Sequence, residues 1–305
     1  MPRVEETLDA FQAHRRLLFS VVYDIVGSVA DAEDVLQETW LRWSAVDPDT
    51  IDNPRAYLVR IATRQALNRL RSLRNRRETY VGPWLPEPLV TDVDGAPDPA
   101  AAAEQADEVS LAMLVVLETL SPAERAVFVL HDVFGLPHDE VADALGRSSA
   151  SVRQLGHRAR EHVQARRPRF PTDDLEQRRL TEAFVAACAD GDLDALTRML
   201  APDVRVVSDG GGKAKAARRE ISGVDKVGRF MLGITKEGLS TPGHALRFVR
   251  VNGEWGLVGY VGSEPTYLGL LDVHDGQIDA VYIVANPDKL ARVAPLTGSG
   301  PTEPV

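Results

Sequence analysis

Cysteine is nearly absent from this sequence. Its 305 residues include one cysteine, Cys188, and seven histidines. A single thiol excludes an intrachain disulfide and suits a reducing compartment. The histidines do not have the spacing of a zinc site, and neither a phosphate-binding P-loop nor a dinucleotide fingerprint occurs. We therefore expect no resident metal or cofactor. Cys188 shares an apolar helical face with Leu180 and Phe184, which predicts a core thiol.

Long hydrophobic runs are also missing. The longest, residues 111–117, is far shorter than the roughly 20 apolar residues that cross a bilayer. Residues 1–9 are too polar for a secretion signal, so we expect a cytoplasmic protein without a membrane segment. The net charge of −10 argues against a protein that coats nucleic acid unaided. Any contact with DNA must use local basic patches or the surface of a partner.

Charge of one sign is missing from each of two adjacent segments. Residues 55–77, a predicted helix, contain eight arginines and no acid, with Tyr57 and Asn68 interleaved. A basic helix of this kind beside a proline-bearing loop is typical of a surface that holds a nucleic-acid strand, although a merely solvated basic helix is the alternative. Residues 78–110 contain no Lys or Arg, and their prolines prevent regular helix. This segment is predicted to be an acidic linker.

Within the linker, the sequence WLPEP at residues 84–88 stands out. The prolines favour an extended backbone, and Trp84 supplies a large apolar anchor. We expect Trp84 to dock either on another part of this chain or on a partner.

Residues 137–166 have the pattern of a helix-turn-helix. Apolar positions recur at helical spacing up to Leu145, and Gly146 is placed as a left-handed C-cap. The next helix begins at residues 148–151, whose hydroxyls can cap it, and one of its faces is basic and rich in hydrogen-bonding groups. Such a helix reads base edges in the major groove. An ordinary helical hairpin is the alternative, and Gly156 costs the second helix about 1 kcal/mol.

Two further regions complete the predicted architecture. Residues 4–44 are predicted to be helical with a break at Gly27, and Asp31 is predicted to be the N-cap of a second helix whose outer face is acidic. That face is either solvated or docks a basic partner. Residues 174–204 predict two helices split at Gly191, followed by a strand, a helix at 223–234 and alternating strands. Asn252-Gly253 and Asp275-Gly276 predict hairpin turns between strands.

Two short motifs in this last region carry information. DGGGK at residues 209–213 places three glycines after a strand, where the loop can approach another backbone closely or form an anion-binding nest. NPDKL at residues 286–290 follows the last predicted strand.

Several motifs together resemble the extracytoplasmic-function (ECF) sigma factors of bacterial RNA polymerase. DAEDVLQETWLRW resembles the family's polymerase-binding helix, and NPRAYLVRIATRQALNRLRS resembles the loop and helix that melt and hold the −10 element. LSPAERAVFVLHDVFGLPHDEVADALGRSSASVRQLGHRARE resembles the domain that reads the −35 element. Leu155 and Gly156 depart from the family pattern, so the resemblance does not indicate which −35 sequence is preferred. The C-terminal region resembles a SnoaL-like (NTF2-like) cone. The trio WLPEP, DGGGK and NPDKL is similar to the ECF subgroup with such a fused domain.

The resemblance implies a multidomain chain. Two all-α sigma domains occupy residues 1–77 (region 2, −10 recognition and core binding) and 109–168 (region 4, −35 recognition). Residues 78–108 link them. An α+β SnoaL-like regulatory domain with a curved antiparallel sheet follows at 169–294, and residues 295–305 form a disordered tail. The implied function is that of a sigma factor, not an enzyme. Its partners are the β and β′ subunits of core RNA polymerase and promoter DNA.

The resemblance also implies four groups of site residues. The −10 group is Asn53, Arg55, Tyr57, Arg60, Arg64, Asn68 and Arg71. The −35 group is Ser151, Arg153, Gln154, His157 and Arg158. The polymerase-binding group is Asp31, Glu33, Asp34 and Gln37. The regulatory group is Trp84, Leu85, Pro86, Glu87, Pro88, Asp209, Gly210, Gly211, Gly212, Lys213, Asn286, Pro287 and Asp288. We expect Trp84 and its prolines to pack near DGGGK, with Glu87 meeting Lys213.

Three alternative functions are open at this stage. The cone could be an enzyme that uses Asp209, His244 or His274 for acid–base chemistry. It could instead be a sensor for a small ligand. The whole chain could also be a helix-turn-helix repressor that binds duplex DNA without polymerase.

Overall fold

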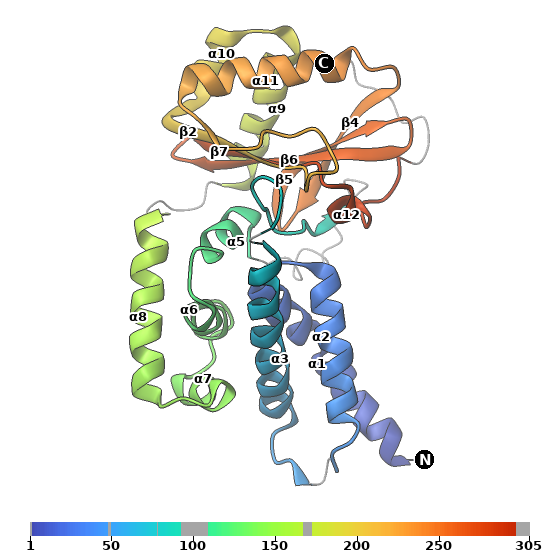
Figure 1. The fold of residues 1–305 in the computed structure, drawn as a ribbon, viewed down its shortest axis with the longest axis vertical. Coiled ribbons are helices and arrows are strands. Elements are labelled where there is room, and N and C mark those ends of the chain that lie inside the picture. The colour runs from blue at the N-terminus through green and yellow to red at the C-terminus, as the bar shows by residue number, and fades with distance from the viewer. Residues whose placement is uncertain (1, 48–49, 78, 93–108, 167–172, 297–305) are drawn as a thin grey trace. The chain divides into compact units, whose positions relative to one another are not determined.

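The computed structural model describes residues 2–47, 50–77, 79–92, 109–166 and 173–296, which fall into two compact units (Figure 1). The first unit holds α1 to α3 and α6 to α8. The second holds Tyr80–Asp92 and all described residues from 173 onward. Most of the predicted acidic linker, residues 93–108, and the tail from residue 297 lie outside the described residues.

Three helices form the first part of unit one: α1 (Pro2–Val26), α2 (Val29–Trp43) and α3 (Pro54–Arg77). Gly27 ends α1 with a positive φ of 73°, where the break was predicted. The predicted N-cap of α2 was wrong, because Ser28 holds that position and its side chain accepts from the Asp31 backbone N–H. Asp31 therefore lies inside the first turn, with its carboxylate free to reach α3. Trp43 is fully buried and donates from Nε1 to the Thr7 carbonyl at 2.8 Å.

The second part of unit one contains the predicted helix-turn-helix. Its elements are α5 (Leu111–Leu117), whose first two residues belong to unit two, α6 (Pro122–Val127), the π-helix η2 (Phe128–Val133), α7 (His138–Leu145) and α8 (Ser149–Arg166). Gly146 is left-handed with φ 63° and caps α7, and Ser148 Oγ accepts from the Ser151 N–H at the start of α8. Both predicted caps are confirmed. A Cβ on Gly156 would lie 3.3 Å from Val127 Cγ1, so close packing of α8 on α6 explains the glycine inside this helix.

Unit two is an α+β domain. Its elements after the linker are α9 (Asp174–Asp190), α10 (Leu193–Met199), β2 (Leu200–Asp209), β3 (Ile221–Ser222), α11 (Val224–Leu239), β4 (His244–Val251), β5 (Glu254–Val261), β6 (Glu264–His274), β7 (Gln277–Val284) and α12 (Pro287–Leu290). Figure 1 shows α9, α10 and α11 gathered on one face of the sheet. The predicted helix split at Gly191 is confirmed, since this residue is left-handed with φ 73°.

The sheet is curved and has the strand order β1-β4-β5-β6-β7-β2-β3. All neighbours are antiparallel except β2 and β7, which run parallel, so the predicted antiparallel sheet is in fact mixed. Asn252 and Asp275 both have φ 50° and are followed by left-handed glycines, which confirms the two predicted hairpin turns. Its first strand, β1 (Val90–Asp92), comes from the linker.

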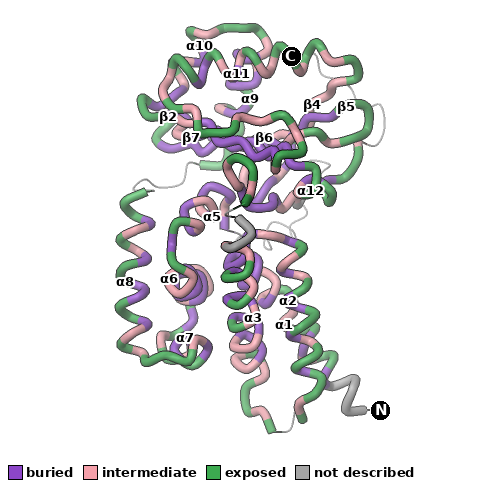
Figure 2. The backbone as a smooth tube through the Cα atoms, in the orientation of Figure 1, coloured by how far each residue is buried: buried purple, intermediate pink, exposed green. Residues whose placement is uncertain are grey.

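A continuous apolar core lies between the sheet and its helices. It includes Phe184, Val206, Met231 and Val281, and Figure 2 shows the central strands as mostly buried. Cys188 is part of this core, and burial raises the pKa of its thiol to about 12. The prediction of a core thiol is confirmed. None of the helices that the structure describes is long and apolar enough to cross a membrane.

Candidate functional sites

Helix α3 presents the predicted −10 residues. Asn53 accepts from the Ala56 N–H at 3.0 Å and so fixes the start of the helix. The Arg60 guanidinium lies 4.8 Å from the centre of the Tyr57 ring, which in turn packs on the ring of buried Trp43. Arg55 and Arg71 are exposed, and Arg71 donates to Asn68 Oδ1 at 3.0 Å. The aromatic and amide groups therefore orient arginines along one helix.

Two of these arginines also contact α7. Arg64 donates to the Ala144 and Asp143 carbonyls at 3.1 and 3.2 Å, and Arg60 pairs with the Asp143 carboxylate at 3.2 Å. No sequence pattern indicated this contact, because the residues are some 80 positions apart in the chain.

The acidic face of α2 is partly paired within unit one. Arg69 of α3 bonds Asp31 at 2.6 Å and Asp34 at 2.9 Å, and Glu33 bonds Arg15 at 2.7 Å. Gln37 is exposed. A partner that binds this face meets an ordered, partly neutralised surface and not four independent side chains.

The predicted −35 residues lie on α8. Arg153, Gln154 and His157 are exposed, and Ser151 is half-buried at the start of the helix. Arg158 is held by Glu124 at 2.9 Å. Arg153 and Gln154 have no partner among the described residues, so their donors and acceptors are available to base edges.

The regulatory motifs meet around one buried carboxylate, Asp209, at the end of β2. Its side chain is fully buried. Oδ1 accepts from Tyr80 Oη at 2.6 Å and from the Gly211 N–H at 3.0 Å. Oδ2 accepts from the Leu85 N–H at 2.9 Å and from Lys289 Nζ at 2.6 Å. Two of these four donors belong to the linker and two to the C-terminal domain. We call this site the latch: Tyr80, Trp84 and Leu85 of the linker with Asp209, Asn286 and Lys289.

Lys289 is the cation of the latch. Besides Asp209, its ammonium bonds the Leu85 carbonyl and lies 4.1 Å from the centre of the Trp84 ring. Its side chain is 11% exposed, so this cation–π contact is largely shielded from water. The predicted docking of Trp84 near DGGGK thus takes the form of a shared lysine next to Asp209.

Asn286 and Tyr80 close the other side of the latch. Asn286 Nδ2 donates to Tyr80 Oη at 2.8 Å, while Asn286 Oδ1 caps α12 by accepting from the Asp288 N–H. Burial, followed by the hydrogen bond to Asp209, raises the pKa of the Tyr80 phenol well above its ordinary value. Tyr80 therefore stays protonated and acts as a donor to the carboxylate.

The glycines of DGGGK make room for the linker. A Cβ on Gly211 would lie 3.0 Å from Tyr80 Oη and would collide with the Asn286 amide, and a Cβ on Gly212 would lie 3.0 Å from the Val81 Cβ. Both glycines have positive φ, 58° and 71°. Gly210 is tight as well, because its Cβ would meet the Ala214 carbonyl. The loop therefore lies close to the linker, as the motif predicted, but it meets the side chains of Tyr80 and Val81 and not another backbone.

The predicted pair of Glu87 with Lys213 was wrong. Lys213 bonds Asp288 at the surface at 2.5 Å, and buried Glu87 lies 3.6 Å from Arg292. Sequence reasoning selected Lys213 because it ends the glycine motif. The buried cation is Lys289, inside NPDKL, and neither Lys289 nor Tyr80 was among the predicted site residues. The signal for Lys289 was its place in the third motif, but no sequence signal distinguished Tyr80.

Beyond the latch, the linker adds a strand to the sheet. Val90 and Asp92 of β1 pair with Val251 and Arg250 of β4, and Leu89 exchanges hydrogen bonds with Asn252 through the Leu89 carbonyl and the Asn252 side chain. Leu85, Pro86 and Pro88 are buried. Residues 80–92, which were predicted to be part of a linker, pack as part of the C-terminal unit.

The three acid–base candidates of the cone have different partners. Asp209 serves the latch, His274 bonds Asp272 at 2.8 Å, and His244 bonds Tyr267 at 3.2 Å. Burial lowers the pKa of His244 and raises that of Tyr267 to about 12, so the neutral forms of both are favoured. Among the described residues, no group of three or more His, Cys, Asp or Glu side chains could hold a metal ion.

These observations define a class of protein: two helical modules with arginine-bearing faces and an α+β domain that binds part of the segment between them. Residues 10–77 match Sigma-70 region 2, and residues 110–163 match Sigma-70, region 4. The chain is 44% identical to the ECF RNA polymerase sigma factor SigJ of Mycobacterium tuberculosis, over 95% of this chain and 97% of that relative. It is 32% identical to the probable ECF sigma factor SigI of the same organism, again over 95% and 97%.

The chain belongs to the ECF RNA polymerase sigma factors. Its fold is similar to the crystal structure of M. tuberculosis SigJ, with a TM-score of 0.74 and 40% identity over 93% of this chain and 98% of that one. The predicted family and fold class are confirmed. As a member of this family, the protein binds core RNA polymerase, directs it to promoters and initiates transcription.

Proposed function

We propose that the C-terminal domain regulates this sigma factor by holding the linker in the latch. The observation that carries the proposal is the set of four donors on Asp209, two of them from the linker. A buried carboxylate is tolerated only when such donors and a cation surround it. The latch is therefore closed as a unit or open as a unit, which is the behaviour that a switch requires.

The roles of the promoter-binding residues are part of the same proposal. Asn53, Tyr57, Asn68 and the arginines of α3 hold the −10 strand. The exposed face of α8 reads the −35 element, and the acidic face of α2 binds the β and β′ subunits of core polymerase. Support comes from the exposed, unpaired Arg153 and Gln154 and from the oriented arginines of α3. Because polymerase and promoter DNA are its partners, we propose that the protein acts in the cytoplasm.

Control by the latch follows from what the linker connects. Region 2 precedes Tyr80 and region 4 follows residue 108, so a linker fastened to the C-terminal domain limits the distances the two modules can adopt. An open latch releases residues 80–92 from the C-terminal domain and returns them to the acidic linker. The spacing of the −10 and −35 modules then depends on polymerase and DNA alone.

Transcription from genomic DNA with purified core polymerase tests this proposal. Transcript starts are mapped for the intact chain, a chain stopped after Arg166, Trp84→Ala, and Leu239→Ala, an exposed apolar position of α11 that serves as a control outside the latch. Trp84→Ala should move the output at least halfway toward that of the shortened chain, while Leu239→Ala should match the intact chain.

The results distinguish failure of the latch proposal from the absence of any regulation by the C-terminal domain. If the shortened chain differs from the intact chain but Trp84→Ala does not, the domain regulates by another route and the latch proposal is lost. If the shortened and intact chains behave alike, the C-terminal domain has no regulatory role.

A small ligand of the cone is a second candidate, favoured by the His244–Tyr267 pair. These two polar groups are hydrogen-bonded and stacked, with a ring-to-ring angle of 17°, next to apolar residues of the domain core. We propose that a small polar metabolite binds there. A thermal-shift screen of small polar metabolites, run on the full chain and on its His244→Phe variant, would detect such binding. A metabolite that stabilises both proteins equally would count against this site.

A further inference from the structure

The arginines of α3 that are proposed to hold the −10 strand have a competitor inside the same unit. Nε of Arg64 donates to the Ala144 carbonyl at 3.1 Å, and Nη2 donates to the Asp143 carbonyl at 3.2 Å. Nη1 of Arg60 lies 3.2 Å from Asp143 Oδ2. Helix α7, the first helix of the helix-turn-helix, thus contacts both arginines.

The acceptors on α7 resemble a phosphate in charge and geometry. The last carbonyls of a helix carry partial negative charge. The Asp143 carbonyl also accepts from the Gly146 N–H at 3.2 Å, and it shares its lone pairs between this cap and Arg64. Asp143 adds a full negative charge at the same place. Arginine grips a phosphate through two parallel N–H donors on one edge of the guanidinium. In Arg64 that edge, Nε with Nη2, is occupied by α7, so it cannot hold a DNA phosphate at the same time.

Further acidic residues of α7 lie beside the start of α3. Asp139 and Glu140 of α7 line a groove together with Arg55 and Val59 of α3. Helix α7 therefore brings three carboxylates to the arginine-bearing side of α3, where a nucleic-acid strand would bring phosphates.

We propose that α7 competes with the −10 strand for Arg60 and Arg64, so that α3 and α7 must separate before α3 holds single-stranded DNA. The inference rests on the proposed −10 role of these arginines. The −35 reading face of α8 is not part of the contact, because Arg153 and Gln154 are exposed. When region 4 binds another surface, α7 moves away from α3 and releases Arg60 and Arg64. Binding by region 4 is thereby coupled to the capture of single-stranded DNA by α3.

Charge reversal on α7 tests the competition in the full chain. Asp143→Arg places a cation opposite Arg60 without altering a proposed DNA-binding residue, and Asp143 is exposed enough for the fold to tolerate it. Asp203→Arg, at an exposed position of β2 in unit two, makes the same change of charge away from both DNA-binding helices and serves as the control. Binding of a short fluorescein-labelled single-stranded DNA of mixed sequence is measured by anisotropy.

The separation itself is measured with nitroxide labels on Ser72→Cys and Ala150→Cys, two exposed positions on α3 and α8. Cys188 is buried and stays unlabelled. Asp143→Arg should lengthen or broaden the label distance. It should also bind the DNA about tenfold more tightly than Asp203→Arg, since apparent affinity rises with the fraction of competent molecules.

Each other result counts against the proposal. Separation without a gain in affinity overturns the competition. In that case, promoter opening is measured with a holoenzyme that carries Arg64→Ala. Unchanged opening would show that the proposed −10 role of α3 is lost as well. If neither Asp143→Arg nor the double variant Asp139→Arg with Asp143→Arg separates the helices or binds DNA more tightly, the contact does not hold the modules together and the inference falls.

Discussion

Two lysine–aspartate pairs near the latch contain the same chemical groups in different surroundings. Lys289 and Asp209 have side chains that are 11% and 0% exposed, whereas those of Lys213 and Asp288 are 55% and 64% exposed. Removing one partner from a buried pair leaves an uncompensated charge, but exposed pairs contribute little. Variants of the two pairs can therefore be compared to measure how much the buried charges of the latch contribute to the free energy of unfolding.

Lys289→Met should therefore destabilise the C-terminal unit strongly. We expect a loss of about 3–5 kcal/mol in the free energy of unfolding, because the Asp209 carboxylate stays buried without its cation. Lys213→Met is the matched control, with an expected loss below about 1 kcal/mol. Urea denaturation followed by tryptophan fluorescence measures both. Similar losses for the two variants would mean that Asp209 is not held as a buried ion.

A second residue-scale prediction concerns the glycine loop. Gly211→Ala meets two obstacles, a positive φ of 58° and a Cβ position occupied by Tyr80 and Asn286. Gly191→Ala meets only the first, with φ 73° and no atom within 4 Å of the Cβ. We expect Gly191→Ala to cost about 1 kcal/mol. Gly211→Ala should cost roughly 1–3 kcal/mol more and should shift the Tyr80 signals in NMR spectra. Equal costs would show that the linker is not packed against this loop.

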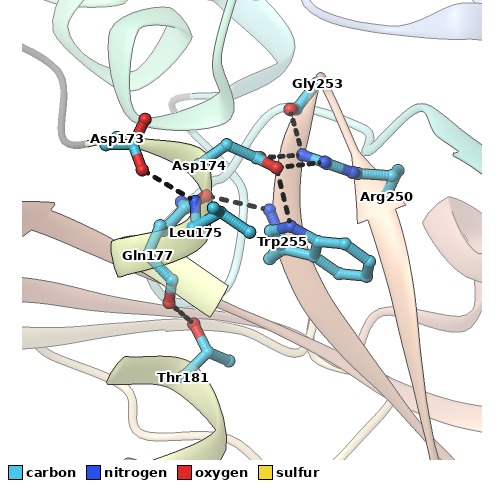
Figure 3. A network of polar contacts seen from close by, with 8 residues as sticks. All are labelled: Asp173, Asp174, Leu175, Gln177, Thr181, Arg250, Gly253 and Trp255. Carbon is cyan, nitrogen blue, oxygen red and sulfur yellow. Dashed lines mark hydrogen bonds and ion pairs between the residues drawn. The ribbon is translucent and has the colours of Figure 1, made fainter. Parts of the chain in front are cut away.

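At the scale of elements, a polar network joins the start of α9 to the hairpin of β4 and β5 (Figure 3). Asp174 pairs with Arg250 and accepts from Trp255 Nε1 at 3.3 Å, and Gln177 Oε1 accepts from the Trp255 N–H at 3.1 Å. Arg250 also lies 4.2 Å from the centre of the Trp255 ring. Strand β4 pairs with the linker strand β1 through Arg250, so this network supports the strand that receives the linker.

The network should make stability depend on pH on the acid side. Hydrogen bonding from Arg250 lowers the pKa of Asp174 despite partial burial. A carboxyl with a lower pKa in the folded state stabilises fully above its unfolded pKa, about 3.9, and loses this contribution as pH falls through the folded value. The difference in unfolding free energy between the natural chain and Asp174→Asn should therefore be largest near neutral pH and shrink below about pH 4. Arg250→Met should remove the same pH dependence. A constant difference at every pH would exclude this ion pair as its source.

The elements also show how far the sequence could lead. Helix caps and hairpin turns followed from local chemistry, as Gly146, Gly191 and Asn252-Gly253 illustrate. Asp31 failed as a cap because Ser28, three residues earlier, offers a hydroxyl at the right distance. The parallel pairing of β2 with β7 could not be predicted, since strand direction depends on a long-range connection and not on local pattern.

The latch was predicted in composition but not in detail. WLPEP was expected to pack near DGGGK, and Asp209 and Asn286 were among the expected regulatory residues. Their partners Tyr80 and Lys289 are separated from each other by more than 200 residues, and motif spacing does not determine which lysine turns inward. The contact of Arg64 with α7 could not be predicted either, because it also joins residues that are far apart in the sequence. The roles of the DNA-binding and polymerase-binding residues stay predictions.

At the scale of the whole molecule, the linker has two competing environments. In the free chain, residues 80–92 belong to the C-terminal unit through the latch and strand β1. We propose that, in the holoenzyme, the acidic linker enters a polymerase channel built for nucleic acid, because its charge resembles that of a nucleic-acid strand. A segment cannot occupy both places, so binding of core polymerase and closure of the latch should oppose each other by the same free energy.

Hydrogen exchange measured by mass spectrometry tests this opposition. In the free chain, the Leu85 amide is bonded to Asp209 and the Asn252 amide to the Leu89 carbonyl, so peptides covering residues 80–92 and 249–253 should exchange slowly. In the holoenzyme the same peptides should exchange faster, while peptides from α11 keep their protection. Lys289→Met should bind core polymerase more tightly than the natural chain, because its latch is already weakened, and Lys213→Met should bind as the natural chain does. Unchanged protection of residues 80–92 in the holoenzyme would mean that the latch stays closed during initiation. Control by the C-terminal domain would then act through a linker that is held throughout and not through its release.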